Sequence, residues 1–247
     1  MMKYGKLAVF ADIGCEREAY EAAQKLNAEY CSEKPETAPV LCFGADGISL
    51  SGGGQVLRCD LTHMVRRLRY DNLTHELTVR AAKLKSVPFP LTLLDATAGF
   101  GEDSLLLAAA GYDVTLYEYD PTIALLLADG LRRASLIQEL SEAVKRMTLV
   151  QGDSVLAMHE LDSAPDVIML DPMFPARQKS ALVKKKFQLL HMLEEPCGDE
   201  QAMLEAAIGT RARKVIVKRP AKGQYLAGVK PDYSVTGKSV RFDCYVK

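Results

Sequence analysis

The stretch that most constrains the fold is residues 91–111, in which two apolar runs flank a glycine-containing turn. The first run, residues 91–94, is too short for a helix and ends in turn residues, which is typical of a buried parallel strand. Gly99 and Gly101 lack the Cβ atoms that would hinder a tight turn and the close approach of a ligand to the backbone. Leucines and alanines then favour a helix that ends at Gly111. This order of strand, glycine turn and helix predicts a nucleotide-type cofactor site in an open α/β sheet.

The residues that open this helix discriminate between two classes of cofactor. A dinucleotide fingerprint has a third glycine where this sequence has Ser104. Glu102 and Asp103 would also repel a phosphate at the helix N-terminus, whereas a ligand with an ammonium group and no phosphate tolerates them. The pattern from Asp95 to Gly101 resembles the first motif of the Rossmann-like S-adenosylmethionine (SAM) methyltransferases.

The composition is that of an ordinary globular protein. The 247 residues are 48% hydrophobic and 26% charged, with a formal net charge of −1, which suits one large domain and a small one. No apolar run is long enough to span a membrane, and the N-terminus shows no signal-peptide pattern. The six cysteines form no CxxC pair, which indicates reduced thiols in a cytoplasmic protein. The four histidines make no zinc spacing with them, so we expect no metal.

Residues 1–60 are predicted to form a small N-terminal α/β lobe, and residues 61–247 the main domain. The lobe is expected to contain a strand at 7–10, a helix at 16–28 and a hairpin formed by residues 40–43 and 48–50. No catalytic pattern is visible in the lobe. We therefore expect it to pack against the main domain or to position a substrate.

The main domain is predicted to be a doubly wound α/β sheet, with strands and helices in alternation. Its predicted elements are strands at 91–94, 113–118, 146–150, 166–170 and 214–218, a terminal hairpin of 235–236 with 240–246, a helix beginning at 72–74 and a helix over 122–140.

Acidic residues close two of these strands. Glu118 lies about 20 residues after the glycine turn, the spacing at which a carboxylate reaches the hydroxyls of a ribose. Asp153 follows the next strand, where a carboxylate can accept a hydrogen bond from an adenine amino group. Aspartate is also common in ordinary turns, so both interpretations of Asp153 stay open.

Asp171, Pro172, Met173 and Phe174 follow the fourth strand and resemble the Asn/Asp-Pro-Pro-Tyr/Phe motif of methyltransferases that act on planar nitrogens. An exocyclic amine on a base is a poor nucleophile because its lone pair is delocalised into the ring. The Asp171 carboxylate and the Pro172 carbonyl can accept its two hydrogens, and Phe174 can stack on the base. A turn that ends a strand and buries an aromatic ring is the structural alternative.

Three basic clusters, at residues 66–69, 177–186 and 211–222, contain no acidic residue. A single cluster is usually a solvated helix face. Three of them in a nearly neutral chain favour a surface that faces a polyanion.

The sequence is similar to the bacterial family of small-subunit ribosomal RNA guanine-N2 methyltransferases J. The matching stretches are residues 95–101, 171–175, 178–185 and 217–220, and the similarity covers roughly residues 60–247. The resemblance implies a Rossmann-like class I methyltransferase fold and methyl transfer from SAM to a guanine amino group near the 3′ end of 16S rRNA. It also implies that the partner is small-subunit rRNA or the 30S subunit.

The predicted site residues fall into three groups. The predicted catalytic residues are Asp171, Pro172 and Phe174. The predicted SAM contacts are Asp95, Gly99, Gly101, Glu102, Asp103, Glu118, Tyr119, Asp153, Ser154 and Asp171. The predicted RNA contacts are Arg66, Arg67, Arg69, Lys179, Lys184, Lys185, Lys186, Lys218 and Arg219.

Three other functions compete with this prediction. N-methylation of another planar nitrogen, in a DNA adenine or a protein glutamine, uses the same motif, but the basic clusters favour RNA. A non-catalytic RNA-binding protein with a degenerate cofactor fold would have a broken motif, and none is found. An NAD-dependent oxidoreductase is disfavoured by Ser104 and the acidic turn.

Overall fold

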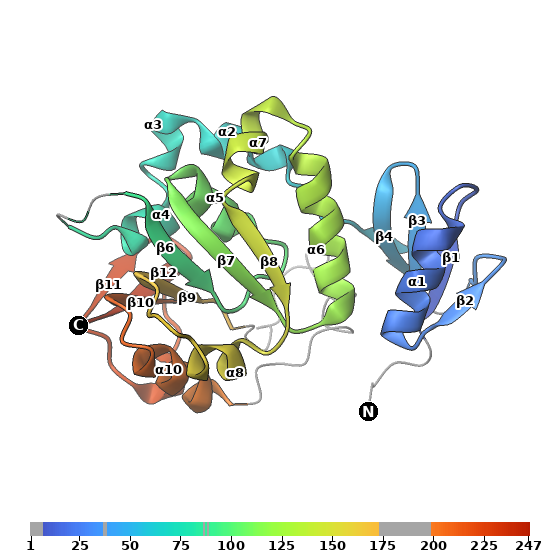
Figure 1. Ribbon diagram of the computed structural model, residues 1–247. Coiled ribbons are helices and arrows are strands. Elements are labelled where there is room, and N and C mark those ends of the chain that lie inside the picture. Colours follow the sequence, from blue (N-terminus) through green and yellow to red (C-terminus); the bar gives the residue numbers. More distant parts are fainter. Residues whose placement is uncertain (1–6, 37–38, 86, 88, 173–198) are drawn as a thin grey trace.

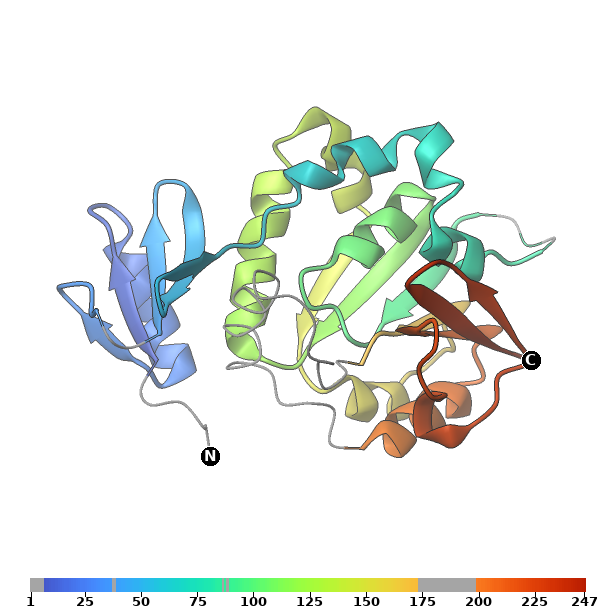
Figure 2. The same ribbon diagram turned by 180° about the vertical axis from the view of Figure 1, so that it is seen from behind.

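The computed structural model describes residues 7–36, 39–85, 87, 89–172 and 199–247. These residues form a five-stranded sheet near the N-terminus and a seven-stranded sheet in the rest of the chain. Figures 1 and 2 show the two sheets in separate lobes, joined by the segment that follows β5. None of the helices in the described ranges is both long enough and apolar enough to cross a bilayer.

The large sheet has the order β11-β12-β10-β9-β6-β7-β8. The strands β6, β7, β8, β9 and β10 are parallel, whereas β12 is antiparallel to both β10 and β11. The bounds are β6 (Leu91–Asp95), β7 (Tyr112–Glu118), β8 (Met147–Gln151), β9 (Val167–Leu170), β10 (Lys214–Pro220), β11 (Tyr233–Thr236) and β12 (Val240–Val246). The predicted doubly wound sheet and its terminal hairpin are confirmed.

Helices cover both faces of this sheet because successive strand residues point to opposite faces. Leu93 and Ile216 belong to one core with α4 (Leu77–Ala82), α5 (Glu102–Ala109), α6 (Pro121–Ala134) and α7 (Gln138–Val144). Leu94 and Val217 belong to a second core with α8 (Ser154–His159) and α10 (Glu200–Gly209). The short helices η1 (Thr62–Met64), α2 (Val65–Leu68), α3 (Tyr70–Leu73) and η2 (Leu226–Gly228) complete the domain.

The small lobe packs α1 (Glu16–Leu26) on a mixed sheet by way of buried alanines and Leu26. Its strands are β1 (Ala8–Ala11), β2 (Glu29–Cys31), β3 (Val40–Gly44), β4 (Gly47–Gly52) and β5 (Gln55–Leu57). The short edge strands β2 and β5 are absent from the prediction. The domain boundary near residue 60 stays a prediction.

Two predicted helices are wrong in their bounds. The single helix over 122–140 is divided into α6 and α7, because Ile137 adopts an extended backbone that lets its side chain and Leu140 reach the core. The helix expected from 72–74 is α4, which begins at Leu77. Glu76 does not cap it with its side chain, since both carboxylate oxygens accept hydrogen bonds from the Arg67 guanidinium at 2.7 and 2.8 Å.

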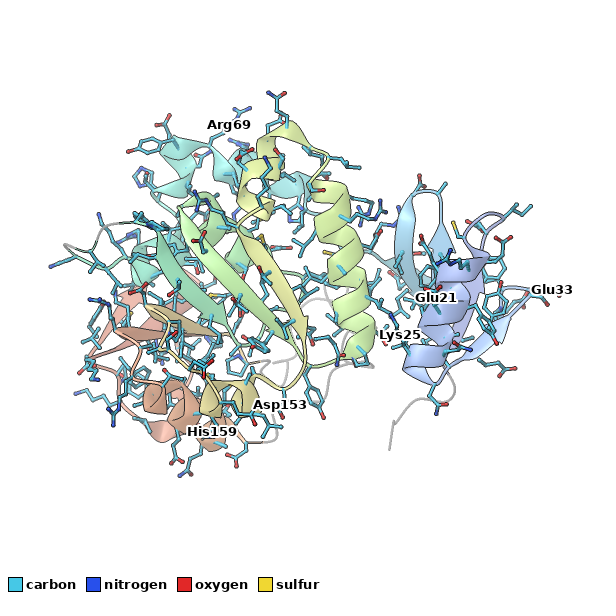
Figure 3. The ribbon with its side chains drawn as sticks, in the orientation of Figure 1. Glu21, Lys25, Glu33, Arg69, Asp153 and His159 are labelled. Carbon is cyan, nitrogen blue, oxygen red and sulfur yellow. The ribbon has the colours of Figure 1, made fainter. Side chains whose placement is uncertain are left out.

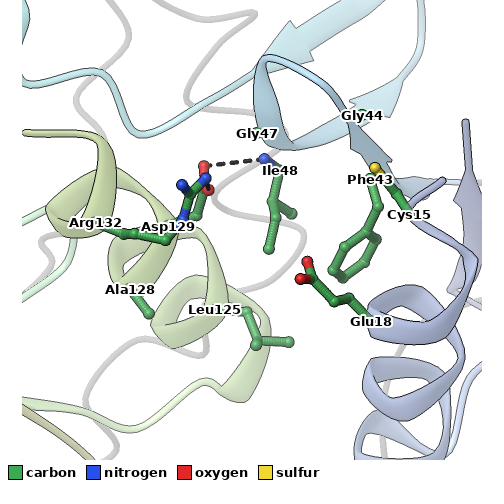
Figure 4. A pocket seen from close by; sticks show the side chains of 10 residues that line it. All are labelled: Cys15, Glu18, Phe43, Gly44, Gly47, Ile48, Leu125, Ala128, Asp129 and Arg132. Carbon is green, nitrogen blue, oxygen red and sulfur yellow. Dashed lines mark hydrogen bonds and ion pairs between the residues drawn. The ribbon is translucent and has the colours of Figure 1, made fainter. Parts of the chain in front are cut away.

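Asp129 on α6 connects the two lobes. Its buried carboxylate accepts a hydrogen bond from the backbone N–H of Ile48 at 3.0 Å, and Arg132 and Arg133 donate to it from the same helix, each at 2.8 Å. Arg133 also donates to the backbone carbonyl of Cys59. Figure 4 shows the hydrogen bond between Asp129 and Ile48 beside a cavity of about 220 Å³ between the lobes.

Replacing Asp129 with alanine is expected to lower the free energy of unfolding by about 1.5–3 kcal/mol, because hydrogen bonds to a buried charge are lost. Denaturant unfolding measures this change. Arg132→Ala is the control, since it removes only a largely exposed partner of the same carboxylate. An Asp129→Ala variant as stable as the Arg132→Ala variant would show that the carboxylate does not couple the lobes.

Candidate active site

The candidate site lies at the carboxyl ends of the parallel strands. The pairing of β6 with β7 and β9, and of β9 with β10, brings the ends of these strands to one edge of the sheet. The glycine turn follows β6, Glu118 ends β7, and Asp171 follows β9. Open α/β sheets bind their ligands at this edge.

The glycine turn has the backbone that its sequence predicts. Gly99 and Gly101 have φ angles of 53° and 70°, in the left-handed region that favours glycine. At Gly101 a Cβ would also lie 3.1 Å from a methyl group of Leu127 on α6. The turn is therefore fixed by glycine for both conformational and steric reasons.

Asp95 lies beneath this turn and supports it from inside. Its carboxylate accepts hydrogen bonds from the Thr97 N–H at 3.0 Å and from the Ser104 hydroxyl at 2.6 Å. Only 1% of Asp95 is exposed, and burial raises the pKa of its carboxyl to about 7. This geometry favours a role in shaping the turn over the predicted direct contact with a ligand.

Glu118 holds the same turn from the neighbouring strand. One carboxylate oxygen accepts from the Gly99 N–H and the other from the Asp120 N–H, both at 2.9 Å. Burial raises the pKa of Glu118 to about 7, against the lowering effect of these hydrogen bonds. Tyr119, the next residue, is 70% exposed and can offer its ring to a ligand.

Asp153 begins α8 at the end of β8, where Figure 3 labels it. One oxygen of its carboxylate accepts from the N–H groups of Val155 and Leu156, at 2.8 and 3.2 Å. Ser154 is buried. Asp153 is therefore the N-cap of α8, in agreement with the structural alternative. Its contact with adenine stays a prediction.

Asp171 is joined to the glycine turn and to β10. Its N–H donates to the Thr97 hydroxyl at 2.6 Å, and one carboxylate oxygen accepts from the Lys218 ammonium at 2.8 Å. Burial raises the pKa of the Asp171 carboxyl, and the positive charge of Lys218 opposes that rise. Pro172, the next residue, is buried.

The two acidic residues that open α5 point to different neighbours. The Asp103 carboxylate accepts from Lys218 at 2.6 Å, which places it beside Asp171. Glu102 lies 3.3 Å from the His63 ring nitrogen and 4.0 Å from the Arg67 guanidinium. The structure thus brings Asp103, and not the Glu102 carboxylate, toward Asp171.

The RNA contacts predicted for Lys218 and Arg219 in the third basic cluster stay predictions, but both side chains, like that of Lys214, are paired within the protein. Lys218 is held between two carboxylates, and the Arg219 side chain is 6% exposed and pairs with Glu200. Lys214 is buried and donates to backbone carbonyls. All three lie on β10, and each is paired with carboxylates or backbone carbonyls of the protein.

The first basic cluster divides in a similar way. Arg67 is engaged by Glu76, whereas Arg66 and Arg69 are exposed. Figure 3 shows Arg69 at the opposite end of the main domain from Asp153. The predicted contacts Phe174, Lys179, Lys184, Lys185 and Lys186 lie outside the described residues.

Two further residues of the site were not predicted in these roles. Thr97 connects Asp95 to Asp171 through its N–H and its hydroxyl, and Lys218 connects Asp171 to Asp103. Lys218 follows the apolar run of β10 at the carboxyl edge. The strand-end rule that selected Asp171 could therefore have found it as well.

Known proteins resemble the chain over nearly its whole length. The family model described as "Putative SAM-dependent methyltransferase" matches residues 30–247. Ribosomal RNA small subunit methyltransferase J of Thioalkalivibrio sulfidiphilus is 41% identical over 242 residues, 93% of each chain. The protein of the same name from Neisseria meningitidis serogroup C is 38% identical and covers 95% of this chain and 96% of its own.

A solved structure agrees with these sequence matches. The crystal structure of a SAM-dependent methyltransferase from Neisseria gonorrhoeae has a TM-score of 0.77 and 33% sequence identity, and the match covers 97% of this chain and 95% of that one. The predicted Rossmann-like methyltransferase fold is confirmed. The chain therefore belongs to the ribosomal RNA small subunit methyltransferase J family of SAM-dependent methyltransferases.

Proposed function

We propose that this protein transfers a methyl group from SAM to the exocyclic N2 amine of a guanine in small-subunit (16S) rRNA. The observation that carries the proposal is the position of Asp171, which the Thr97 hydroxyl ties to the glycine turn. An acceptor for the amine thus lies next to the predicted binding site of the methyl donor. Membership of the methyltransferase J family supports the same reaction.

SAM would bind along the carboxyl edge of the sheet. The backbone at Gly99 and Gly101 offers close approach, and Glu118 is placed to accept from the ribose hydroxyls once it exchanges its present partners. The exposed ring of Tyr119 can stack on the adenine. Asp103 and Asp171 give the methionine end an acidic environment, which suits its ammonium and sulfonium groups.

The chemistry requires an in-line approach of the guanine nitrogen to the sulfonium methyl. The N2 lone pair forms the new N–C bond while the S–C bond breaks. The electron pair of the S–C bond stays on sulfur, which gives S-adenosylhomocysteine. The Asp171 carboxylate and the Pro172 carbonyl would accept the amine hydrogens and turn the lone pair toward the methyl group. Catalysis then depends on positioning, and the extra proton leaves to Asp171 or to water.

The RNA would be held mainly through its phosphates. Arg66 and Arg69 are exposed on the main domain, and we propose Lys179 and Lys184 to Lys186 as further contacts. The substrate is small-subunit rRNA, free or within the 30S subunit, so the enzyme acts in the cytoplasm.

The direct test is transfer of a labelled methyl group from SAM to small-subunit rRNA or to 30S subunits, followed by mass mapping of the modified nucleotide. The expected product is N2-methylguanosine at one site, and rRNA from a strain without the gene should lack that mark and accept label. Label on DNA or on protein, with none on rRNA, would contradict the proposal.

Replacing Glu118 with alanine is expected to weaken SAM binding by about 1.5–3 kcal/mol, since charge-assisted hydrogen bonds to the ribose are lost. The raised pKa adds a pH dependence. The ionised carboxylate is the better acceptor, so wild-type affinity should rise by up to about tenfold from about pH 6 to about pH 8. Calorimetry with S-adenosylhomocysteine measures both effects.

Glu118→Gln is the matched control for this titration. It keeps one acceptor oxygen but cannot ionise, so its affinity should be nearly independent of pH over the same range. A wild-type affinity that stays constant with pH, or a folded Glu118→Ala variant with unchanged affinity, would remove Glu118 from the site.

A further inference from the structure

Lys218 joins three elements at the carboxyl edge of the sheet. It lies at the end of β10, and its ammonium donates to Asp171 after β9 at 2.8 Å and to Asp103 in the first turn of α5 at 2.6 Å. The Lys218, Asp103 and Asp171 side chains are 27%, 19% and 33% exposed. This triad is therefore partly shielded from solvent but open to a ligand.

We propose that Lys218 is a positioning residue for methyl transfer: its ammonium fixes one oxygen of Asp171 and leaves the other oxygen to accept from the guanine amine. The proposal rests on the function proposed above, because it assigns Asp171 to that amine. The basic cluster at residues 211–222 predicts an RNA contact for Lys218 instead. The Lys218 ammonium is already paired with two carboxylates, so its charge does not need an RNA phosphate as a partner.

The first argument is geometric. The hydrogen bonds to Asp171 fix the backbone N–H through Thr97 and one carboxylate oxygen, Oδ2, through Lys218. A carboxylate anchored at one oxygen has a defined direction for the lone pairs of its other oxygen. A positioned acceptor of this kind is what an amine needs to present its own lone pair at a fixed angle.

The second argument is electrostatic. The charged groups that face Asp171 are Lys218 and Arg219 from β10, Asp103 from α5 and Asp95 from β6. Asp103 and burial favour the neutral acid at Asp171, whereas the two cations favour the carboxylate. Burial would lower the pKa of Lys218, but its two acidic partners raise the pKa above its ordinary value, so it stays charged. Lys218 is thus the directly bonded group that favours the carboxylate form of Asp171 over the neutral acid.

Replacing Lys218 with methionine tests the proposal through the pH dependence of the maximal rate. The acidic limb is the pH range in which kcat falls as Asp171 becomes protonated. Loss of an adjacent opposite charge should move this limb to higher pH by about one to three units. Activity lost near neutrality should be partly recovered at higher pH. The KM for RNA and the affinity for S-adenosylhomocysteine should change by less than about threefold, since Lys218 holds neither ligand.

Three further variants are expected to give an opposite shift or none. Asp103→Asn removes the competing carboxylate, so the acidic limb should move downward. Lys218→Arg keeps the charge and should leave the limb near its wild-type position. Lys238→Met removes an exposed lysine in the turn between β11 and β12 and is the control for charge alone.

Three results would overturn the proposal. One is an acidic limb that stays in place in Lys218→Met while the folded enzyme remains active. Another is a loss of S-adenosylhomocysteine affinity above about tenfold, which would assign Lys218 to the methionine carboxylate. The third is a rise in the KM for RNA with an unchanged kcat, which would restore the RNA contact. Wild-type enzyme that fails to methylate rRNA would contradict the proposed function instead, so the two failures are distinguishable.

Discussion

Asp171→Ala is expected to lower the rate of methyl transfer to rRNA by about a hundredfold or more, because the amine loses the acceptor that orients its lone pair. RNA affinity should change little, since phosphate contacts supply most of it. SAM binding should fall modestly, because Asp171 lies beside Asp103 where the methionine end is expected. Single-turnover kinetics with saturating RNA and SAM separates the chemical step from binding.

Asp171→Asn distinguishes orientation from proton transfer. The amide keeps one acceptor oxygen and matches the asparagine of related motifs, so orientation predicts partial activity. An asparagine variant as inactive as the alanine variant would favour a proton-accepting role. The control is Asp162→Ala, which removes an exposed aspartate in the loop before β9, at the opposite edge of the sheet. Near-normal activity of Asp171→Ala would mean that the base is held elsewhere.

The sequence predicts several of the parallel strands well because buried apolar residues recur along each of them. The predicted strands at 91–94, 113–118 and 214–218 each begin and end within two residues of the observed strands. Short apolar runs bounded by turn or charged residues leave little freedom for another structure. The order of the strands in the sheet depends on how the helices cross over, and no local pattern encodes that order.

The sequence predicts the site residues that lie at the ends of strands. It does not predict the roles of residues that depend on ion pairs between distant parts of the chain. Glu118 and Asp171 were found because each acid closes an apolar strand. Lys218 and Arg219 were read as parts of a basic surface, since the sequence does not show that Asp103, Asp171 and Glu200 approach them from elsewhere in the chain. A cluster of like charges in sequence can thus be an array of separate ion pairs in space.

The boundaries of helices show a similar limit. The Asp120 carboxylate caps α6 by accepting hydrogen bonds from two backbone N–H groups, and Pro121 occupies the first helical position, which suits its fixed φ angle. The end of α6 near Ala134 has neither glycine nor proline to mark it. Its position follows from the packing of Ile137 and Leu140 on the core, which is a tertiary effect.

The largest effect on stability is expected on β12, the neighbour of β10, where Arg241 and Asp243 form a buried ion pair. Asp243 is fully buried and accepts two hydrogen bonds from the Arg241 guanidinium, at 2.7 and 3.0 Å. The remaining nitrogen of that guanidinium donates to the backbone carbonyls of Pro220, Ala221 and Gly223. The pair therefore fixes the turn that follows β10, only a few residues beyond Lys218.

Asp243→Ala should lower the free energy of unfolding by about 3–5 kcal/mol, because it leaves the arginine charge buried without its anion. That loss is a large part of the 5–15 kcal/mol, roughly, that a domain has in total. Ser234→Ala is the matched control, since its hydroxyl donates to the same carboxylate at 2.6 Å from the exposed edge strand. The serine donor is neutral and lies on an exposed strand, so losing this hydrogen bond to the carboxylate should cost about 1.5 kcal/mol, less than losing the ion pair. Equal losses from the two variants in denaturant unfolding would show that the backbone ladder between β10 and β12, and not the ion pair, holds the terminal hairpin in the sheet.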